Sequence, residues 1–142
     1  GACLANDYDV LEWLGEWQKR VADRPLNLFA NYAMNMAAEG TNRLDTAYSV
    51  GVTYGRASSS IPSSWEFGLL YQLIEKDAMF GQWVDSDFAG GVTDASGYAF
   101  RGAYQLNSNL RLGWVWMINE LQVDTSAGKD YERIMIDLNW SF

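Results

Sequence analysis

The chain contains no histidine and only one cysteine, Cys3, among its 142 residues. Without histidine, His-based catalytic triads and histidine metal sites are excluded, and hydrolytic chemistry that depends on a histidine general base is disfavoured. A single cysteine cannot form an intrachain disulfide. We therefore expect a protein that is not an enzyme, has no disulfide framework and carries no cofactor.

Long apolar runs are also missing, because the longest, such as residues 114–118, contain about five residues. A transmembrane helix needs roughly 20, so helical membrane spans are excluded. Yet 49% of the residues are hydrophobic and 15% are aromatic, while the mean hydropathy is slightly negative. The apolar residues are therefore dispersed, as they are in alternating strands.

Positive charge is scarce, and the formal net charge is −8. Nucleic-acid binding requires a basic face, so we expect no nucleic-acid partner. The acidic balance fits two interpretations equally well: soluble loops, or a selective field inside a pore.

Alternation is the feature that the chain has in abundance. At the C-terminus, apolar side chains occupy every second position from Ile134 to the final Phe142, and Asp137 and Asn139 lie between them. A strand that ends on an aromatic residue is typical of bacterial outer-membrane β-barrels. Such a strand predicts recognition by the barrel-assembly machinery, and the signal would consist of Ile136, Leu138, Trp140 and Phe142.

Seven segments alternate with a period of two, which is the side-chain period of a β-strand. They are residues 8–21, 26–36, 45–56, 64–74, 98–106, 109–119 and 131–142. Their apolar faces carry aromatic residues near the strand ends, such as Tyr48 and Tyr54, whereas the opposite faces are rich in small residues. Aromatic girdles of this kind are expected where strands face lipid. The pattern predicts an all-β fold: a single domain, residues 1–142, forming an antiparallel transmembrane β-barrel segment of about seven up-and-down strands. The alternative is a soluble β-barrel.

The connections support a membrane barrel, because short and long ones alternate. Residues 22–25 and 107–108 form short turns, whereas 37–44, 75–97 and 121–130 are longer and would lie outside the cell; the Ser-rich stretch 57–63 fits less well. Bacterial single-chain barrels have even strand numbers. We therefore expect this chain to be the C-terminal part of a larger barrel.

Several motifs resemble the C-terminal region of the bacterial "putative porin" family. They are Tyr71-Gln72, Glu75-Lys76-Asp77-Ala78, Asp85-Ser86-Asp87-Phe88, Gly90-Gly91, Thr93-Asp94, Gly97-Tyr98, Asp130-Tyr131-Glu132-Arg133 and the ending from Asp137 to Phe142. The similarity runs from about residue 8 onward. It implies a channel in the outer membrane of a Gram-negative bacterium, with outer-membrane lipid and small solutes or ions as partners. It supplies no catalytic residues. A homo-oligomer is possible, because many porins are trimers.

The alternation also indicates which charged residues would line a pore, where they would set its selectivity. They are Glu12, Glu16, Asp45, Glu66, Arg101, Arg111, Arg133 and Asp137. Acidic residues outnumber basic ones only slightly, so the set does not predict an ion preference. We expect Arg111 and Asp137 to pair across their neighbouring strands.

The long segment 75–97 contains four further carboxylates: Asp77, Asp85, Asp87 and Asp94. Carboxylates can bind Ca²⁺, but an EF-hand pattern fails because Ala89 and Ser96 stand at two ligand positions. A looser divalent site, a solvated loop and a loop folded into the lumen all remain open. Glycines such as Gly90 and Gly91 would permit the turns that folding inward requires.

The predicted function is passive diffusion of small hydrophilic solutes or ions through an outer-membrane porin-like channel. A non-conducting structural or adhesive barrel is the first alternative. A soluble β-barrel that binds an apolar ligand is the second.

Overall fold

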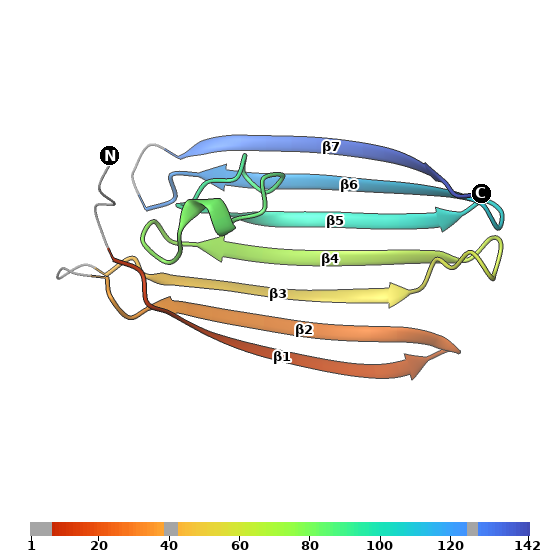
Figure 1. Cartoon of the computed structure of the whole chain (residues 1–142), viewed down its shortest axis with the longest axis horizontal. Coiled ribbons are helices and arrows are strands. Elements are labelled where there is room, and N and C mark those ends of the chain that lie inside the picture. The colour runs from red at the N-terminus through yellow and green to blue at the C-terminus, as the bar shows by residue number, and fades with distance from the viewer. Residues whose placement is uncertain (1–6, 39–42, 125–127) are drawn as a thin grey trace.

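The computed structural model describes residues 7–38, 43–124 and 128–142, so that Cys3 and parts of the connections 36–45 and 122–128 lie outside the described residues. Seven antiparallel strands form one sheet in which the spatial order is the sequence order (Figure 1). The strands are β1 (Val10–Val21), β2 (Arg24–Asn35), β3 (Thr46–Gly55), β4 (Trp65–Ile74), β5 (Ala95–Gln105), β6 (Leu110–Leu121) and β7 (Lys129–Trp140). The predicted seven-stranded up-and-down architecture is confirmed.

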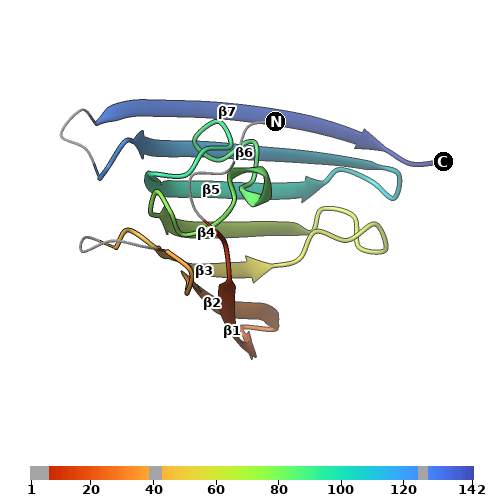
Figure 2. The same cartoon turned by 60° about the vertical axis from the view of Figure 1, so that its left-hand side comes forward.

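The sheet is open in the part of the chain that the structure describes. β1 pairs only with β2, and β7 pairs only with β6. Figure 2 shows β1 and β2 turning out of the plane in which β4 to β7 lie, as expected of a twisted sheet. The two outer strands therefore each present one unpaired backbone edge.

The turn between β1 and β2 is shorter than the sequence suggested. Ala22 and Asp23 have φ values of 47° and 62°, and positive φ at both central residues defines the tight two-residue hairpin turn that matches strand twist. Arg24 and Pro25, expected in the turn, instead belong to β2 and pair with Val21 and Arg20. Proline near the start of a strand is tolerated there.

β5 begins at Ala95, earlier than the expected residue 98. The start of this strand cannot be recognised from hydrophobic alternation, because Ala95, Gly97 and Ala99 are small. Gly97 is required, because a Cβ atom at this position would lie 2.5 Å from the Cα atom of Asn119 in β6. Small residues at this end of β5 therefore permit close packing that a hydrophobicity pattern does not reveal.

The two faces of the sheet differ sharply. The aromatic face is the one that carries Trp13, Trp17, Tyr32, Tyr48, Val50, Tyr54, Trp65, Phe67, Tyr71, Tyr98, Phe100, Tyr104, Trp114, Trp116, Ile134, Ile136, Leu138 and Trp140. Many of these side chains are exposed, from 37% for Tyr48 to 76% for Trp140. The opposite face, here called the loop face, carries small and polar residues.

Aromatic contacts run across strands on the aromatic face. In the half toward the long connections, the Tyr71 ring lies 6.0 Å from Tyr48 and 4.9 Å from Tyr98, measured between centroids. Toward the short connections, Trp65 lies 5.7 Å from Tyr54, and the Arg24 guanidinium lies 4.5 Å above its ring. The rings of Tyr54 and Trp65 therefore lie at one rim, as expected of an aromatic girdle, whereas Tyr71 pairs with Val50 nearer the middle of the sheet.

The connections between strands fall into two groups, one at each end of the sheet. Residues 22–23, 56–64 and 106–109 join strands at the end where the chain terminates, and residues 36–45, 75–94 and 122–128 join them at the other end. The segment 75–94, here called the long loop, contains the short 3₁₀ helix η1 (Gly81–Trp83). It folds across the loop face above β3 to β6 (Figures 1 and 2). None of the described helices is both long and apolar enough to cross a membrane.

Candidate functional site

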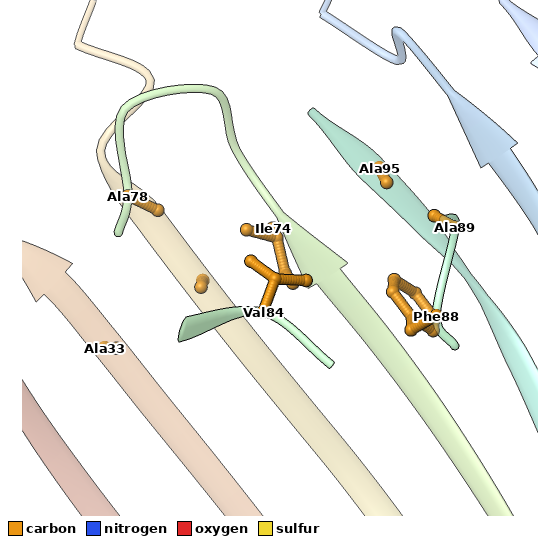
Figure 3. Packing of buried hydrophobic residues seen from close by; sticks show 8 residues of the cluster. Ala33, Ile74, Ala78, Val84, Phe88, Ala89 and Ala95 are labelled. Atoms are coloured by element: carbon orange, nitrogen blue, oxygen red, sulfur yellow. The ribbon is translucent and has the colours of Figure 1, made fainter. Parts of the chain in front are cut away.

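The candidate site is the loop face together with the long loop that covers part of it. Figure 3 shows the buried cluster that joins them. Ala33, Ala47, Ile74 and Ala95 come from β2, β3, β4 and β5, and Ala78, Val84, Phe88 and Ala89 come from the long loop. All eight are less than 9% exposed, and Phe88 is 2% exposed. The strands contribute mostly alanine, which lets the loop backbone approach the sheet.

Tight turns give the long loop its compact path. The amides of Val84, Phe88 and Gly91 donate to carbonyls three residues earlier, at 3.2, 3.1 and 2.8 Å. Gly90 and Gly91 both have φ of 76°, a conformation that glycine adopts without steric cost. The structure places the long loop on the loop face of the sheet; that this face borders a lumen stays a prediction.

Polar contacts fasten the long loop to β6 and β7. Arg133 on β7 forms an ion pair with Asp87 at 3.0 Å. Asn119 on β6 is 4% exposed, and in the amide orientation that satisfies both of its polar atoms, its oxygen accepts from the Ala89 amide at 2.9 Å. The loop is therefore held on this side by charge and hydrogen bonds as well as by apolar burial.

Asn35, at the end of β2, is a buried junction that the sequence analysis missed. It is 0% exposed. Its Oδ1 accepts from the Asp9 and Ala37 amides at 3.0 and 3.1 Å, and its Nδ2 donates to the carbonyls of Asp7 and Asp77 at 3.2 and 2.9 Å. The sequence gives no signal for this role of Asn35, because its hydrogen-bond partners come from three separate segments of the chain.

The strand residues predicted to line a pore share the loop face. Glu12, Glu16, Glu66, Arg101, Arg111, Arg133 and Asp137 all lie there by register, and Asp45 directly precedes β3. Glu12 and Glu16 are exposed, whereas Asp45 is 6% exposed and pairs with Arg43 at 2.6 Å. The structure thus brings these charges to one face without gathering them into one cluster.

The expected pair of Arg111 and Asp137 is wrong. Arg111 lies opposite Asn139, and Asp137 lies opposite Gly113. Arg111 instead forms an ion pair with Glu66 on β4, at 3.7 Å. The register of β6 and β7 is offset by two residues from the register that the expected pair requires. Arg111 reaches across β5 to Glu66, whose neighbour on β5 is the small residue Ala103.

The four aspartates of the segment 75–97 do not converge. Asp87 pairs with Arg133, Asp85 Oδ1 accepts from the Asp87 amide at 3.0 Å, and Asp94 Oδ1 accepts from the Asp124 amide at 2.8 Å. The carbonyl of Asp77 accepts from Asn35. No group of three or more His, Cys, Asp or Glu side chains that could hold a metal ion is found among residues 7–38, 43–124 and 128–142.

The connection 122–128 touches the long loop through Asp124. Its Oδ2 accepts from the Lys76 amide at 3.2 Å. Burial raises the pKa of the Asp124 carboxyl above its ordinary value of 3.8; the hydrogen bond from Lys76 opposes this shift, and the nearby Asp94 reinforces it. The environment of this carboxyl therefore favours its protonated form.

The C-terminal strand presents its apolar residues on the aromatic face. Ile136, Leu138 and Trp140 are 72%, 64% and 76% exposed. Phe142 lies beyond the end of β7 and is fully exposed, while the neighbouring Ser141 amide still donates to the Asn109 carbonyl at 2.9 Å. These four residues therefore border the unpaired edge of the sheet.

Comparison with known proteins gives one match. A family model described as "Putative porin" matches residues 4–142. Neither the curated proteins nor the solved structures contain a significant match to this chain.

The buried ring of Phe88 should hold the long loop against the sheet. Replacing a buried phenylalanine by alanine typically costs about 3–5 kcal/mol, so Phe88→Ala should release the loop. We expect much faster protease cleavage within residues 75–94 of the folded, detergent-solubilised protein. Val92→Ala is the matched control, because Val92 is 46% exposed. Equal cleavage rates in the two variants would contradict this role of Phe88.

Acidification should stabilise the packing of the connection 122–128 against the long loop. Because burial and the nearby Asp94 raise the pKa of Asp124 in the folded protein, its stabilising contribution is complete below the ordinary pKa and is lost as pH rises through the raised value. The hydrogen bond from the Lys76 amide opposes this shift, because it favours the ionised carboxylate. We expect protease cleavage within residues 75–94 of the folded, detergent-solubilised protein, measured relative to an unfolded reference substrate at each pH, to slow as pH falls from neutral. Asp124→Asn should remove this pH dependence and show the slower cleavage already at neutral pH, whereas cleavage that slows as pH rises would contradict this assignment.

Proposed function

Because the chain belongs to the putative porin family, we propose that its sheet is part of the wall of an outer-membrane β-barrel through which small hydrophilic solutes or ions diffuse. The observation that carries this proposal is the division of the sheet into an exposed aromatic face and a polar face onto which a loop folds. Lipid then contacts the aromatic face, and the loop face borders the lumen. No enzymatic step is part of the proposal.

Exposure of the aromatic face supports a lipid environment. Trp13, Trp17, Val50 and Ile134 are 70%, 51%, 47% and 63% exposed, and they belong to one continuous surface over strands β1 to β7. Soluble monomers rarely expose apolar patches of this extent. In a bilayer the same surface is favourable, and strand pairing satisfies the backbone groups that lipid cannot.

Closure of the barrel requires partners for β1 and β7. An unpaired strand edge in lipid leaves several amide and carbonyl groups unsatisfied, each costing several kcal/mol. Further strands therefore complete the wall, from the rest of the polypeptide or from further copies of it. The C-terminal strand, with Ile136, Leu138, Trp140 and Phe142 along its edge, is the element that we assign to recognition by the barrel-assembly machinery.

A second candidate function also has support. The long loop buries Val84 and Phe88 against the sheet, and a loop fixed in this way can obstruct a lumen as well as narrow it. In that case the protein is a structural or adhesive barrel that does not conduct. The same loop position serves both functions, so a measurement of current is needed to separate them.

Current through single molecules tests the proposed function. The natural full-length protein, refolded in detergent and inserted into a planar bilayer, should give stepwise ohmic conductance, because the lumen is water-filled. A folded, heat-modifiable barrel that never conducts would support the plugged barrel instead. A protein that stays monodisperse without detergent would contradict both membrane functions and support a soluble barrel.

A charge on each face tests which face meets lipid. Val50 lies midway along β3 on the aromatic face, and Thr53 lies on the loop face opposite Asn27 and Gly68. An arginine near the bilayer midplane costs about 2–4 kcal/mol on a lipid-facing position. Val50→Arg should therefore lower the free energy of unfolding in lipid vesicles by that amount, and Thr53→Arg should lower it far less. An equal loss in both variants would contradict the assignment of the faces.

A further inference from the structure

We propose that the space between the long loop and strands β1 to β4 is a binding site for small organic cations, meaning solutes with a protonated amine next to an apolar group. The proposal rests on the proposed function, because it places this site in the lumen. It goes further by naming the class of solute that the barrel would favour.

The site is a pocket of about 530 Å³, within the size range of small-molecule sites. Strands β1 to β4 form one wall, and Met79, Val84 and Asp85 of the long loop form the other. The loop is fastened at its far side to β6 and β7, through Arg133 and Asn119. On the β1 side, the Asp77 carbonyl accepts from Asn35 and the Phe80 ring lies 5.9 Å from that of Tyr8, so the loop is held on this side as well.

The charges around the pocket are of one sign. Glu12 contributes a carboxylate from β1 and Asp85 contributes one from the long loop, and no lysine or arginine is among the described residues that line the pocket. The loop-face cations Arg111 and Arg133 pair with Glu66 and Asp87. Two carboxylates on facing walls without a cation between them favour a positively charged solute.

The hydrogen-bonding groups also favour a donor-rich solute. Asn31 Nδ2 donates to Glu12 Oε1 at 2.7 Å, which fixes the orientation of the amide. Asn31 Oδ1 is then buried and accepts no hydrogen bond from any described residue. The side chains of Ser49 and Gln72 follow Asn31 across β3 and β4 in register. An ammonium group in the pocket can donate to the exposed carboxylate of Glu12, which the Asn31 amide holds in place.

The rest of the pocket is apolar. Its lining includes Ala33, Ala47, Ile74, Met79 and Val84, and all of these except Met79 belong to the buried cluster under the long loop. This surface cannot replace the hydration shell of a small metal ion, but it can contact an alkyl chain. The combination of two carboxylates and an apolar wall therefore matches an alkylammonium better than an inorganic cation or an anion.

Butylammonium is the probe, and butyrate is its control of opposite charge and similar shape. Binding is measured by ligand-observed NMR titration of the refolded full-length protein in a zwitterionic detergent, with empty micelles subtracted. We expect saturable binding of butylammonium, with butyrate at least about tenfold weaker. Glu12→Gln should weaken butylammonium about tenfold, because it removes the charge and keeps the acceptor for Asn31.

Glu16→Gln is the matched variant, because it removes the same charge from the same strand and face outside the pocket. We expect it to change the Kd by no more than about twofold. Equal weakening by both substitutions would overturn the proposal, since the general field of the face would then explain binding. Binding of butyrate as tight as that of butylammonium would overturn it as well.

Conductance of the same preparation separates this proposal from the proposed function. A channel that conducts but shows no saturable butylammonium binding contradicts the site alone. A barrel that binds butylammonium through Glu12 but never conducts supports the site and contradicts the diffusion function. A conducting channel should also show current interruptions by butylammonium that Glu12→Gln relieves.

Discussion

The close approach of the long loop to the sheet is the contact on which the rest of this structure depends. It is possible because the strands present Ala33, Ala47 and Ala95 beneath the loop, where larger side chains would hold it away. Val84 and Phe88 then fill the space, and the hydrophobic effect stabilises the loop at a fixed height. The height of the loop in turn sets the shape of the pocket that opens beside it.

Charge pairing makes the loop face asymmetric. On the side of β6 and β7, the guanidinium of Arg133 is neutralised by Asp87, and the same contact pins the loop. On the side of β1, the Glu12 carboxylate accepts a hydrogen bond from the neutral side-chain amide of Asn31. A face that carries both signs of charge in similar numbers can therefore attract one sign locally, because Arg111 and Arg133 pair with carboxylates away from the pocket and no lysine or arginine is among the described residues that line it. Counting charges along the strands could not reveal this difference.

Much of the fold could be predicted from the sequence, because a period of two directly reports which residues share a face. All seven strands are where alternation indicated them. The errors fall where alternation says nothing: Ala22 and Asp23 form a turn through positive φ, and small residues conceal the first three residues of β5, which begins at Ala95 rather than at residue 98.

The candidate site was less predictable. The residues on the loop face follow from alternation, but their partners depend on register and on the path of the long loop. Arg111 reaches Glu66 across an intervening strand, and Asn35 joins segments that are distant in sequence. Neither contact has a signature in a single sequence, because each one arises only when several strands have paired.

The order of the strands has a consequence for how the molecule assembles. Each strand pairs only with its neighbours in sequence, so the sheet has few distant pairings and each hairpin closes a short stretch of chain. Such a topology can grow by adding one hairpin at a time. The contact of Asn35 with Asp77 joins residues 42 positions apart and is therefore one of the longer-range contacts around the sheet. The pocket has both of its walls only when strand pairing and loop docking are complete.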